Sequence, residues 1–341
     1  MDGVKRANGH RVNGVIPLVG RPPLPGPHPT AADVGFDLDA VLGAVRPLRS
    51  SIPADAFTAA TLGTEREGNA VLIDSDGLLL TIGYLIVEAT QVMIGDDGGR
   101  GVAAHVVGYD HETGFGLIRT ERPIAGRPIA LARDSAALVA DTPVVIAAHG
   151  GVSQAVIGSV AARRVFAGSW EYLLDSAIFT VPLHPHWSGA ALIGKDDGRL
   201  YGTGSLFVQE AGVSGSAVPG NMFVPIDLLA PIFEDLRTLG RPSKKPRPWL
   251  GMHTTEALGH LLIAGVHDGG PADRAGVKPG DIVLRVDGAA VRSLADMYRR
   301  LWSSGAAGVE IRLDLVRGSD TVAIVVQSSD RHRFLRQPQR H

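Results

Sequence analysis

Short apolar runs separated by glycine and aspartate follow one another through residues 68–225. Ala70–Ile73 and Leu78–Thr81 flank the polar segment Asp74–Gly77, a pattern that predicts two strands joined by a tight turn. The later runs form two groups of about six short strands, which favours two β-barrels or a large sandwich. These later strands are expected at Gln91–Ile94, Ala103–Tyr109, Phe115–Arg119, Pro143–Ala148, Val156–Ala162, Tyr172–Asp175, Ile178–Val181, Ala190–Ile193, Arg199–Gly204 and Met222–Pro225.

Three segments have apolar residues at helical spacing, namely 38–45, 227–240 and 293–302. Pro47 is expected to end the first helix, because proline cannot continue a helical hydrogen-bond ladder. Gly240 marks the end of the second helix. The chain is therefore expected to be mainly β, with a few short helices.

Proline-rich segments divide the chain. Residues 1–35 combine prolines and glycines with little to bury, which predicts a disordered or extended tail. Arg241–Pro248 is basic and rich in proline, and we expect it to link a domain at 36–240 to a compact unit at 249–329. Residues 330–341 are expected to form a basic, solvated tail.

Composition excludes several classes of function. The chain has 341 residues, of which 45% are hydrophobic and 20% charged, and its net charge of -2 gives no reason to expect nucleic acid or a membrane as partner. It has no cysteine, which excludes disulfides, thiol catalysis and cysteine-ligated zinc, and we expect no metal and no cofactor. No apolar run approaches the ~18 residues of a membrane span. Because residues 1–35 carry no apolar core with a cleavage site, we expect a cytoplasmic protein, or a periplasmic one if the true N-terminus lies upstream.

One polar stretch, His184–Gly189, offers candidate chemistry. A serine that follows a sharp turn at the end of a strand can present its hydroxyl as an acyl-transfer nucleophile. The same residues also suit a plain tight turn, in which Ser188 and Gly189 serve the turn geometry. The stretch by itself favours the plain turn, so the interpretation depends on the chain on either side.

The chain resembles the HtrA/Deg serine proteases at four places in collinear order. Gly68–Thr81 is similar to the hairpin that leads to the catalytic histidine of that family, and Val106–Arg119 to the strand pair that holds its aspartate. The stretch around Ser188 is similar to the nucleophile loop, and Phe223–Asp227 to the segment that closes the protease domain. The resemblance implies a chymotrypsin/trypsin-like double β-barrel at 36–240.

The compact unit after the linker resembles a PDZ domain. Trp249–Met252 is similar to the loop of such domains, and Gly270–Asp281, with its Gly-Pro-Ala and Gly-Asp ends, is the more specific match. The fold expected for the whole chain is thus mainly β, with a double β-barrel followed by a PDZ domain.

Peptide binding is what the PDZ resemblance implies for Leu250, Gly251 and Met252. In PDZ domains this loop directs successive backbone N–H groups at the C-terminal carboxylate of a peptide, which then adds as a strand at the sheet edge. Tyr298 and Leu301 on the nearby helix either shape the apolar pocket or belong to the core, and the core is favoured for Leu301.

The catalytic residues of the family are not all present. Ser188 stands at the nucleophile position, but Tyr84 stands at the histidine position and Gly114 at the aspartate position. A triad needs an imidazole that accepts the serine proton and a carboxylate that orients it, and neither tyrosine nor glycine can supply these. The oxyanion hole is expected at His186 and Ser188, where His186 replaces a glycine that often has positive φ in such a turn.

Another residue could in principle supply a base to Ser188. His184, His186 and Lys195 lie close to it in sequence, while His105 and His111 lie near the lost aspartate. A Ser–His or Ser–Lys dyad is therefore one interpretation of the sequence. The alternative is that each of these five residues is a surface or turn residue, and that alternative is favoured.

Three functions follow from this pattern. The favoured one is an HtrA-like pseudoprotease that binds unfolded or C-terminal peptide segments in protein quality control or regulation. The second is an active serine endopeptidase with a rearranged base, and the third is a structural subunit that uses the barrels for oligomer contacts. The expected partners are peptides or unfolded protein C-termini and, by resemblance, further copies of the chain in a trimer.

Overall fold

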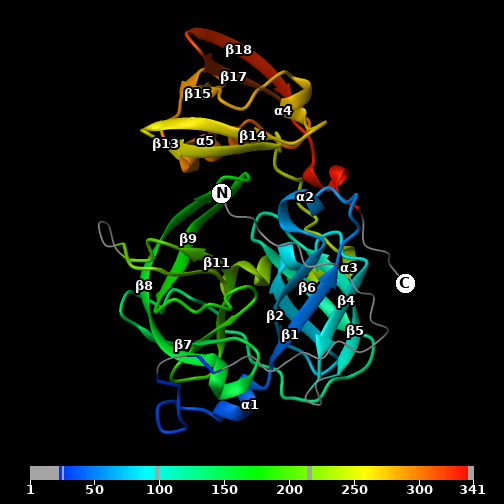
Figure 1. The fold of residues 1–341 in the computed structure, drawn as a ribbon, viewed down its shortest axis with the longest axis vertical. Coiled ribbons are helices and arrows are strands. Elements are labelled where there is room, and N and C mark those ends of the chain that lie inside the picture. The colour runs from blue at the N-terminus through cyan, green and yellow to red at the C-terminus, as the bar shows by residue number, and fades with distance from the viewer. Residues whose placement is uncertain (1–22, 25–26, 97–99, 213–216, 337–341) are drawn as a thin grey trace, which may run out of the picture.

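A computed structural model describes residues 23–24, 27–96, 100–212 and 217–336. Two closed six-stranded β-barrels lie side by side, and a smaller sheet with its own helices lies above them in Figure 1. This arrangement confirms the predicted double β-barrel followed by a PDZ domain.

The first barrel closes in the order β1-β2-β3-β6-β5-β4. Its core includes the side chains of β3, all of which are buried. The predicted turn between β2 and β3 is present, and Gly77 adopts a φ of +79° in it, which only glycine adopts without steric cost. The strands are β1 (Val45–Ser51), β2 (Glu65–Leu72), β3 (Leu78–Ile82), β4 (Gln91–Gly95), β5 (Gly101–Tyr109) and β6 (Phe115–Thr120).

The expectation that Pro47 ends a helix is wrong. The helix α1 (Leu38–Leu42) ends earlier, and Pro47 lies inside β1. β1 pairs with β2 along its whole length, but its pairing with β4 begins only at Leu48. Proline is tolerated at this position because a strand with a neighbour on one side only needs fewer N–H donors.

The second barrel closes in the order β10-β11-β12-β9-β8-β7. The strands predicted at Tyr172–Asp175 and Ile178–Val181 are one continuous strand. β8 and β9 form a long hairpin whose tip lies beneath the upper sheet in Figure 1. The strands are β7 (Pro143–Ala147), β8 (Ala155–Gly168), β9 (Tyr172–Val181), β10 (Ala191–Gly194), β11 (Leu200–Val208) and β12 (Gly220–Pro225).

Short helices connect the strands of the two barrels. The helical pattern over 227–240 is divided into three pieces, and the last of them ends at Gly240 with a φ of +77°, as the glycine predicts. These helices are α2 (Ala59–Leu62), η1 (Gly83–Leu85), η2 (Gly151–Gln154), η3 (Ile226–Leu228), η4 (Ala230–Ile232) and α3 (Phe233–Leu239).

The upper sheet has the strand order β13-β14-β15-β17-β18, so β13 lies at its edge. Helix α5 (Leu294–Ser303) covers this sheet, and the side chain of Ser293 caps it by accepting a hydrogen bond from the N–H of Asp296. The other elements are β13 (Met252–Ala257), β14 (His260–Val266), α4 (Pro271–Arg274), β15 (Ile282–Val286), β16 (Ala289–Ala290), β17 (Glu310–Arg317), β18 (Asp320–Gln327) and η5 (Arg331–Phe334).

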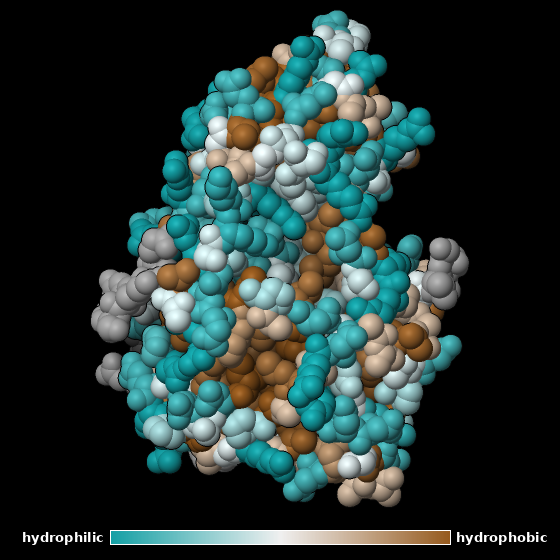
Figure 2. Space-filling model, turned by 180° about the vertical axis from the view of Figure 1, so that it is seen from behind, coloured by the Kyte–Doolittle hydropathy of each residue, from teal (hydrophilic) through white to brown (hydrophobic). Residues whose placement is uncertain are grey.

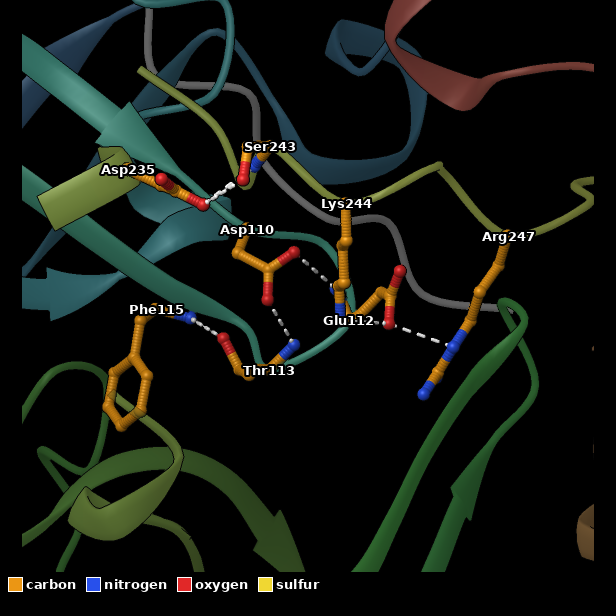
Figure 3. A network of polar contacts seen from close by, with 8 residues as sticks. All are labelled: Asp110, Glu112, Thr113, Phe115, Asp235, Ser243, Lys244 and Arg247. Carbon is orange, nitrogen blue, oxygen red and sulfur yellow. Dashed lines mark hydrogen bonds and ion pairs between the residues drawn. The ribbon is translucent and has the colours of Figure 1, made fainter. Parts of the chain in front are cut away.

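The linker over 241–248 is held against the first barrel, as Figure 3 shows. Glu112, in the turn after β5, forms ion pairs with Lys244 at 2.7 Å and with Arg247 at 2.8 Å. Asp235 on α3 accepts a hydrogen bond of 2.7 Å from the hydroxyl of Ser243. Since exposed ion pairs contribute only about 0–1 kcal/mol each, these contacts position the linker more than they stabilise the fold.

Both ends of the described chain contact the barrels. Leu24 is buried and its N–H donates to Ser153 O at 3.0 Å; the remainder of the tail expected at 1–35 lies partly outside the described residues. At the other end the solvated tail expected from residue 330 is not observed up to 336. Leu335 is buried beside Tyr109, and the N–H of Arg336 donates to Glu88 at 3.0 Å. Residues 337–341 lie outside the described part of the chain.

Among the described residues, no helix is both long enough and apolar enough to cross a membrane.

Candidate functional site

Ser188 lies in the loop between β9 and β10, where the two barrels meet. Gly189 follows it with a φ of +71°, and its N–H donates to Gly204 O at 2.8 Å. A Cβ atom added to Gly189 would lie 1.9 Å from Asn69 O, so no other residue fits there. The glycine after Ser188 is thus required by the close approach of the first barrel.

Asn69 of β2 holds this loop in place, a role that the sequence analysis missed. Its Nδ2 donates to His186 O at 3.0 Å and to Ser188 O at 2.9 Å. Its Oδ1 accepts from the backbone N–H of His149 at 2.9 Å, and the side chain is fully buried. The only sequence signal was an asparagine directly before the apolar run Ala70–Ile73.

Tyr84, on η1, lies next to Ser188. Its hydroxyl oxygen is 2.8 Å from Ser188 Oγ and 2.8 Å from the backbone oxygen of Ser205. A carbonyl oxygen can only accept, so the single phenolic proton goes to Ser205 and Ser188 donates its proton to Tyr84. Ser205 is the extra residue of a β-bulge between β11 and β12, which leaves its carbonyl for this bond.

The phenol cannot act as a base in this setting. Burial raises the pKa of Tyr84 well above its ordinary value, and the hydrogen bond from Ser188 lowers it by less. The neutral phenol oxygen is a very weak proton acceptor, and the phenolate is not populated near neutral pH. Tyr84 therefore gives Ser188 a hydrogen-bond acceptor and no base.

Gly114 adopts a φ of +88°, and a Cβ atom there would lie 3.1 Å from the hydroxyl of Tyr172. This hydroxyl donates to Thr113 O at 2.7 Å, and burial raises the pKa of Tyr172. The space next to Gly114 thus holds the neutral phenol of Tyr172. The nearby carboxylate of Asp110 accepts from the N–H of Thr113 at 2.9 Å, so it stabilises the turn between β5 and β6.

The N–H expected to line the oxyanion hole has another partner. The backbone N–H of His186 donates to Nδ1 of His184 at 3.1 Å, while Nε2 of His184 lies 3.1 Å from Gln154 O. His184 is therefore neutral with its proton on Nε2, and both ring nitrogens have partners other than Ser188. The strain expected at His186 is absent, since its φ is not positive, and the loop instead directs this N–H away from an oxyanion.

The remaining candidate bases are held elsewhere by their contacts. The ring of His111 packs against those of Tyr109 and His332, at 5.1 and 4.8 Å between centroids, and burial lowers its pKa. Lys195 lies in the turn after β10, where its carbonyl accepts from the N–H of Gly35 at 3.2 Å. His105 is an exposed residue of β5.

A large cleft lies away from Ser188. Its volume is about 1090 Å³, and it is lined by the end of β5, the linker and residues 330–333. On the face seen in Figure 2, hydrophobic side chains gather in a hollow of the lower part of the molecule, beneath the upper sheet. Neither Ser188 nor Tyr84 lines the cleft, so it gives no support to a catalytic role for them.

The segment for which peptide binding was predicted, Leu250–Met252, leads into β13, and Gly251 has a φ of +77°. The N–H groups of Leu250, Gly251 and Met252 converge on one carboxylate, that of Glu171, at distances of 2.9, 2.7 and 2.9 Å. Glu171 lies at the tip of the β8–β9 hairpin and is buried. Burial raises its pKa, while the three N–H groups act in the opposite direction. Sequence reasoning missed Glu171, because it is 79 residues from the loop that it contacts.

Two family descriptions match separate parts of the chain. The description "trypsin-like peptidase domain" matches residues 68–202, and "PDZ domain" matches residues 248–327. The first match covers most strands of the two barrels and the second covers the upper sheet with α5.

The curated relatives include bacterial endoproteases. A protein of Halomonas elongata, named as a DegP-like periplasmic serine endoprotease, is 25% identical over 277 residues, which are 77% of this chain and 56% of the relative. DegQ of Escherichia coli, named as a periplasmic pH-dependent serine endoprotease, is 24% identical over 276 residues, which are 76% and 58%. The chain thus spans just over half the length of these two relatives. Their periplasmic location contradicts the cytoplasmic location expected from the sequence, and that expectation is wrong.

Solved structures show the same fold. A variant of the HtrA-type protease AlgW, solved with a tripeptide, aligns with a TM-score of 0.52 at 20% identity, over 89% of this chain and 99% of that one. At this level of identity the likeness establishes the fold.

Proposed function

We propose a peptide-binding function without proteolysis for this chain, which belongs to the HtrA/Deg-like family of trypsin-like serine proteases that carry a PDZ domain. In this proposal the PDZ domain captures C-terminal or unfolded segments of other proteins, and the barrels serve as a scaffold. The task it performs is quality control or regulation, and further copies of the chain assemble with it, as in a trimer.

The observation that carries the proposal is the direction of the proton between Ser188 and Tyr84. A serine nucleophile requires a base that takes its proton. Here the proton of Ser188 points to a neutral phenol, whose own proton is donated to Ser205 O at 2.8 Å. Removing the base of a triad forfeits most of its ~10⁶-fold contribution to kcat. The diverted N–H of His186 removes an oxyanion donor, which costs a further 10²–10³-fold, as an order of magnitude.

Labelling of Ser188 by a fluorophosphonate tests this proposal. The purified protein should remain unlabelled and should not degrade an unfolded substrate such as reduced casein, under conditions in which trypsin does both. The variant Ser188→Ala should be identical to the wild type in both assays. Stoichiometric labelling that disappears in Ser188→Ala would establish the second candidate, an active endopeptidase, which the names of the relatives favour.

Restoring the family residues should give at most weak activity. Tyr84→His supplies an imidazole, but Gly114→Asp places a side chain at a φ of +88° and 3.1 Å from the hydroxyl of Tyr172. We therefore expect the pair to require Tyr172→Phe as well, which removes the competing hydroxyl. Appreciable proteolysis by the triple variant, and none by Tyr84→His alone, would support the assignment of these two positions.

Peptide binding separates this function from that of a purely structural subunit. A mixture of peptides with free, apolar C-termini should bind, and the amidated mixture should bind about tenfold or more weakly, because charge-assisted hydrogen bonds are lost. Equal absence of binding by both mixtures, in the wild type and in Glu171→Ala alike, would leave the structural subunit as the function.

A further inference from the structure

The carboxylate of Glu171 lies where a peptide carboxylate would have to bind. Its Oε1 accepts from the N–H of Gly251 at 2.7 Å and of Met252 at 2.9 Å, and its Oε2 accepts from Leu250 at 2.9 Å. Three successive backbone N–H groups around one carboxylate form an anion-binding nest of the kind that captures C-termini. These donors cannot serve a second carboxylate while Glu171 holds them.

The backbone of the hairpin tip adds to this contact. The N–H of Thr254 on β13 donates to Ser169 O at 2.9 Å, on the sheet edge where a peptide strand would be added. On the other side, the hydroxyl of Tyr298 on α5 donates to Gly168 O at 2.7 Å. The tip thus lies between β13 and α5 and is bonded to both.

An apolar side chain of the same hairpin completes the set. Leu173 is buried, and it belongs to the core cluster of the upper sheet together with Leu250, Met252 and Leu301. Carboxylate, main-chain bond and apolar side chain are the three features by which a PDZ groove holds a peptide. All three come here from the second barrel.

The backbone of Glu171 is strained for the sake of this contact. Its φ is +59°, a left-handed conformation that is sterically unfavourable for a residue other than glycine. Glycine or asparagine is the usual residue at such a position. A glutamate at this turn is explained by what its carboxylate binds.

We propose that Glu171 is an internal ligand of the PDZ groove, so that the β8–β9 hairpin and an external peptide carboxylate compete for the loop Leu250–Met252. The inference rests on the proposed function, since it takes the ligand to be a C-terminal carboxylate. In the closed state the groove is filled from within the chain. In the open state the hairpin tip has withdrawn and a peptide binds in its place.

The competition lowers the apparent affinity for peptides. A protein whose binding-competent state is populated to a fraction f binds with a Kd raised by 1/f. Weakening the closed state therefore tightens peptide binding without any new contact to the peptide. Glu171→Gln is the suitable change, because it keeps the shape but loses the charge and places an amide NH₂ near three N–H donors.

Peptide titration of the full chain tests the inference. The probe is a mixture of short peptides with free, apolar C-termini, and the same mixture with amidated C-termini is the control. Glu171→Gln and Glu171→Ala should bind the free acids about tenfold or more tightly than the wild type does. Asp175→Asn is the matched variant, because it breaks an exposed ion pair between the same hairpin and Arg299 of α5 and leaves the loop Leu250–Met252 intact. An exposed ion pair contributes little to the closed state, so this variant should bind within about threefold of the wild type, well below the change expected for Glu171→Gln.

Hydrogen exchange gives a second measurement on the unmodified protein. Free-acid peptides should increase amide exchange in the hairpin tip, 168–173, while they protect β13. This measurement decides the matter even where a Glu171 variant fails to fold.

The possible failures are distinguishable. Equal affinities of the wild type and Glu171→Gln, with no change of exchange at the tip, would overturn the internal ligand and leave peptide binding intact. Absence of binding by the wild type and by both Glu171 variants, or equal binding of acid and amide, would overturn the proposed function itself.

Discussion

The hydroxyl of Ser188 should stabilise the fold, and this can be measured without any substrate. Ser188→Ala removes the 2.8 Å hydrogen bond to Tyr84 and leaves the phenolic bond to Ser205 O in place. A hydrogen bond of this kind contributes about 0.5–1.5 kcal/mol to the free energy of unfolding. We therefore expect Ser188→Ala to destabilise the protein by about 1 kcal/mol.

Tyr84→Phe should cost more, because it leaves the bulged carbonyl of Ser205 without its buried donor. The expected loss is about 1–3 kcal/mol, the usual cost of an unsatisfied buried polar group. Once Tyr84 lacks its hydroxyl, Ser188→Ala has no bond left to remove. The double variant should thus be no less stable than Tyr84→Phe, with a coupling energy of about 1 kcal/mol between the two positions.

Guanidinium unfolding followed by far-ultraviolet circular dichroism measures all four proteins of this cycle, with free-energy differences taken from the midpoints and a common m-value. The sign of the change in the free energy of unfolding caused by Ser188→Ala is decisive. Active sites are often maintained at the expense of stability, so removing a working nucleophile tends to stabilise an enzyme. A stabilised Ser188→Ala, or strictly additive effects of the two substitutions, would refute the view that Ser188 is part of an inert polar network.

Two further predictions concern the junction of the PDZ domain with the barrels. Glu112→Ala removes the ion pairs to Lys244 and Arg247, so trypsin should cut the linker faster than in the wild type or in the control Glu121→Ala. Gel time courses measure the rate of cutting, and an unchanged rate would contradict the anchoring of the linker. Burial lowers the pKa of His267 from 6.5 to about 4. As the pH falls, the unfolded chain therefore binds a proton at His267 before the folded protein does, and the free energy of unfolding should decline from pH 6.5 towards pH 4. Denaturant midpoints measured across this range should fall less for His267→Leu than for the wild type.

Local signals in the sequence were sufficient for the elements of the fold. Polar turns between apolar runs predict the hairpin around Gly77, which takes the positive φ that only glycine adopts freely. Helical spacing predicts a helix at 293–302, and α5 lies there with Ser293 as its cap. Pro47 led to a wrong prediction of a helix end, because whether a strand tolerates proline depends on how many neighbouring strands it has at that point.

The arrangement of the site depends on contacts between distant residues, which no local pattern records. The resemblance predicts that Tyr84 stands at the position of the family's histidine, but it gives no sign of the acceptor of the phenolic proton, Ser205 O, which a bulge on the other barrel leaves available. Tyr172 fills the space beside Gly114 and donates to Thr113 O, which lies 59 positions away in the chain. No local pattern records this contact either. Glu171 was missed for the same reason.

Under the proposed function, the contacts around Ser188 explain how a protease scaffold persists without catalysis. An imidazole and a carboxylate buried together require charge compensation, and a site that loses one of them is left with an unpaired buried group. In this chain neutral hydroxyls occupy both places and each has a carbonyl acceptor: Tyr84 donates to Ser205 and Tyr172 to Thr113. A buried network in which the hydroxyls are satisfied without charge is stable at neutral pH and gives no group that titrates there. Tyr172 is also the first residue of β9, directly after Glu171 at the tip of the β8–β9 hairpin. In this proposal the second barrel keeps a role, because it presents the carboxylate of Glu171 to the PDZ groove.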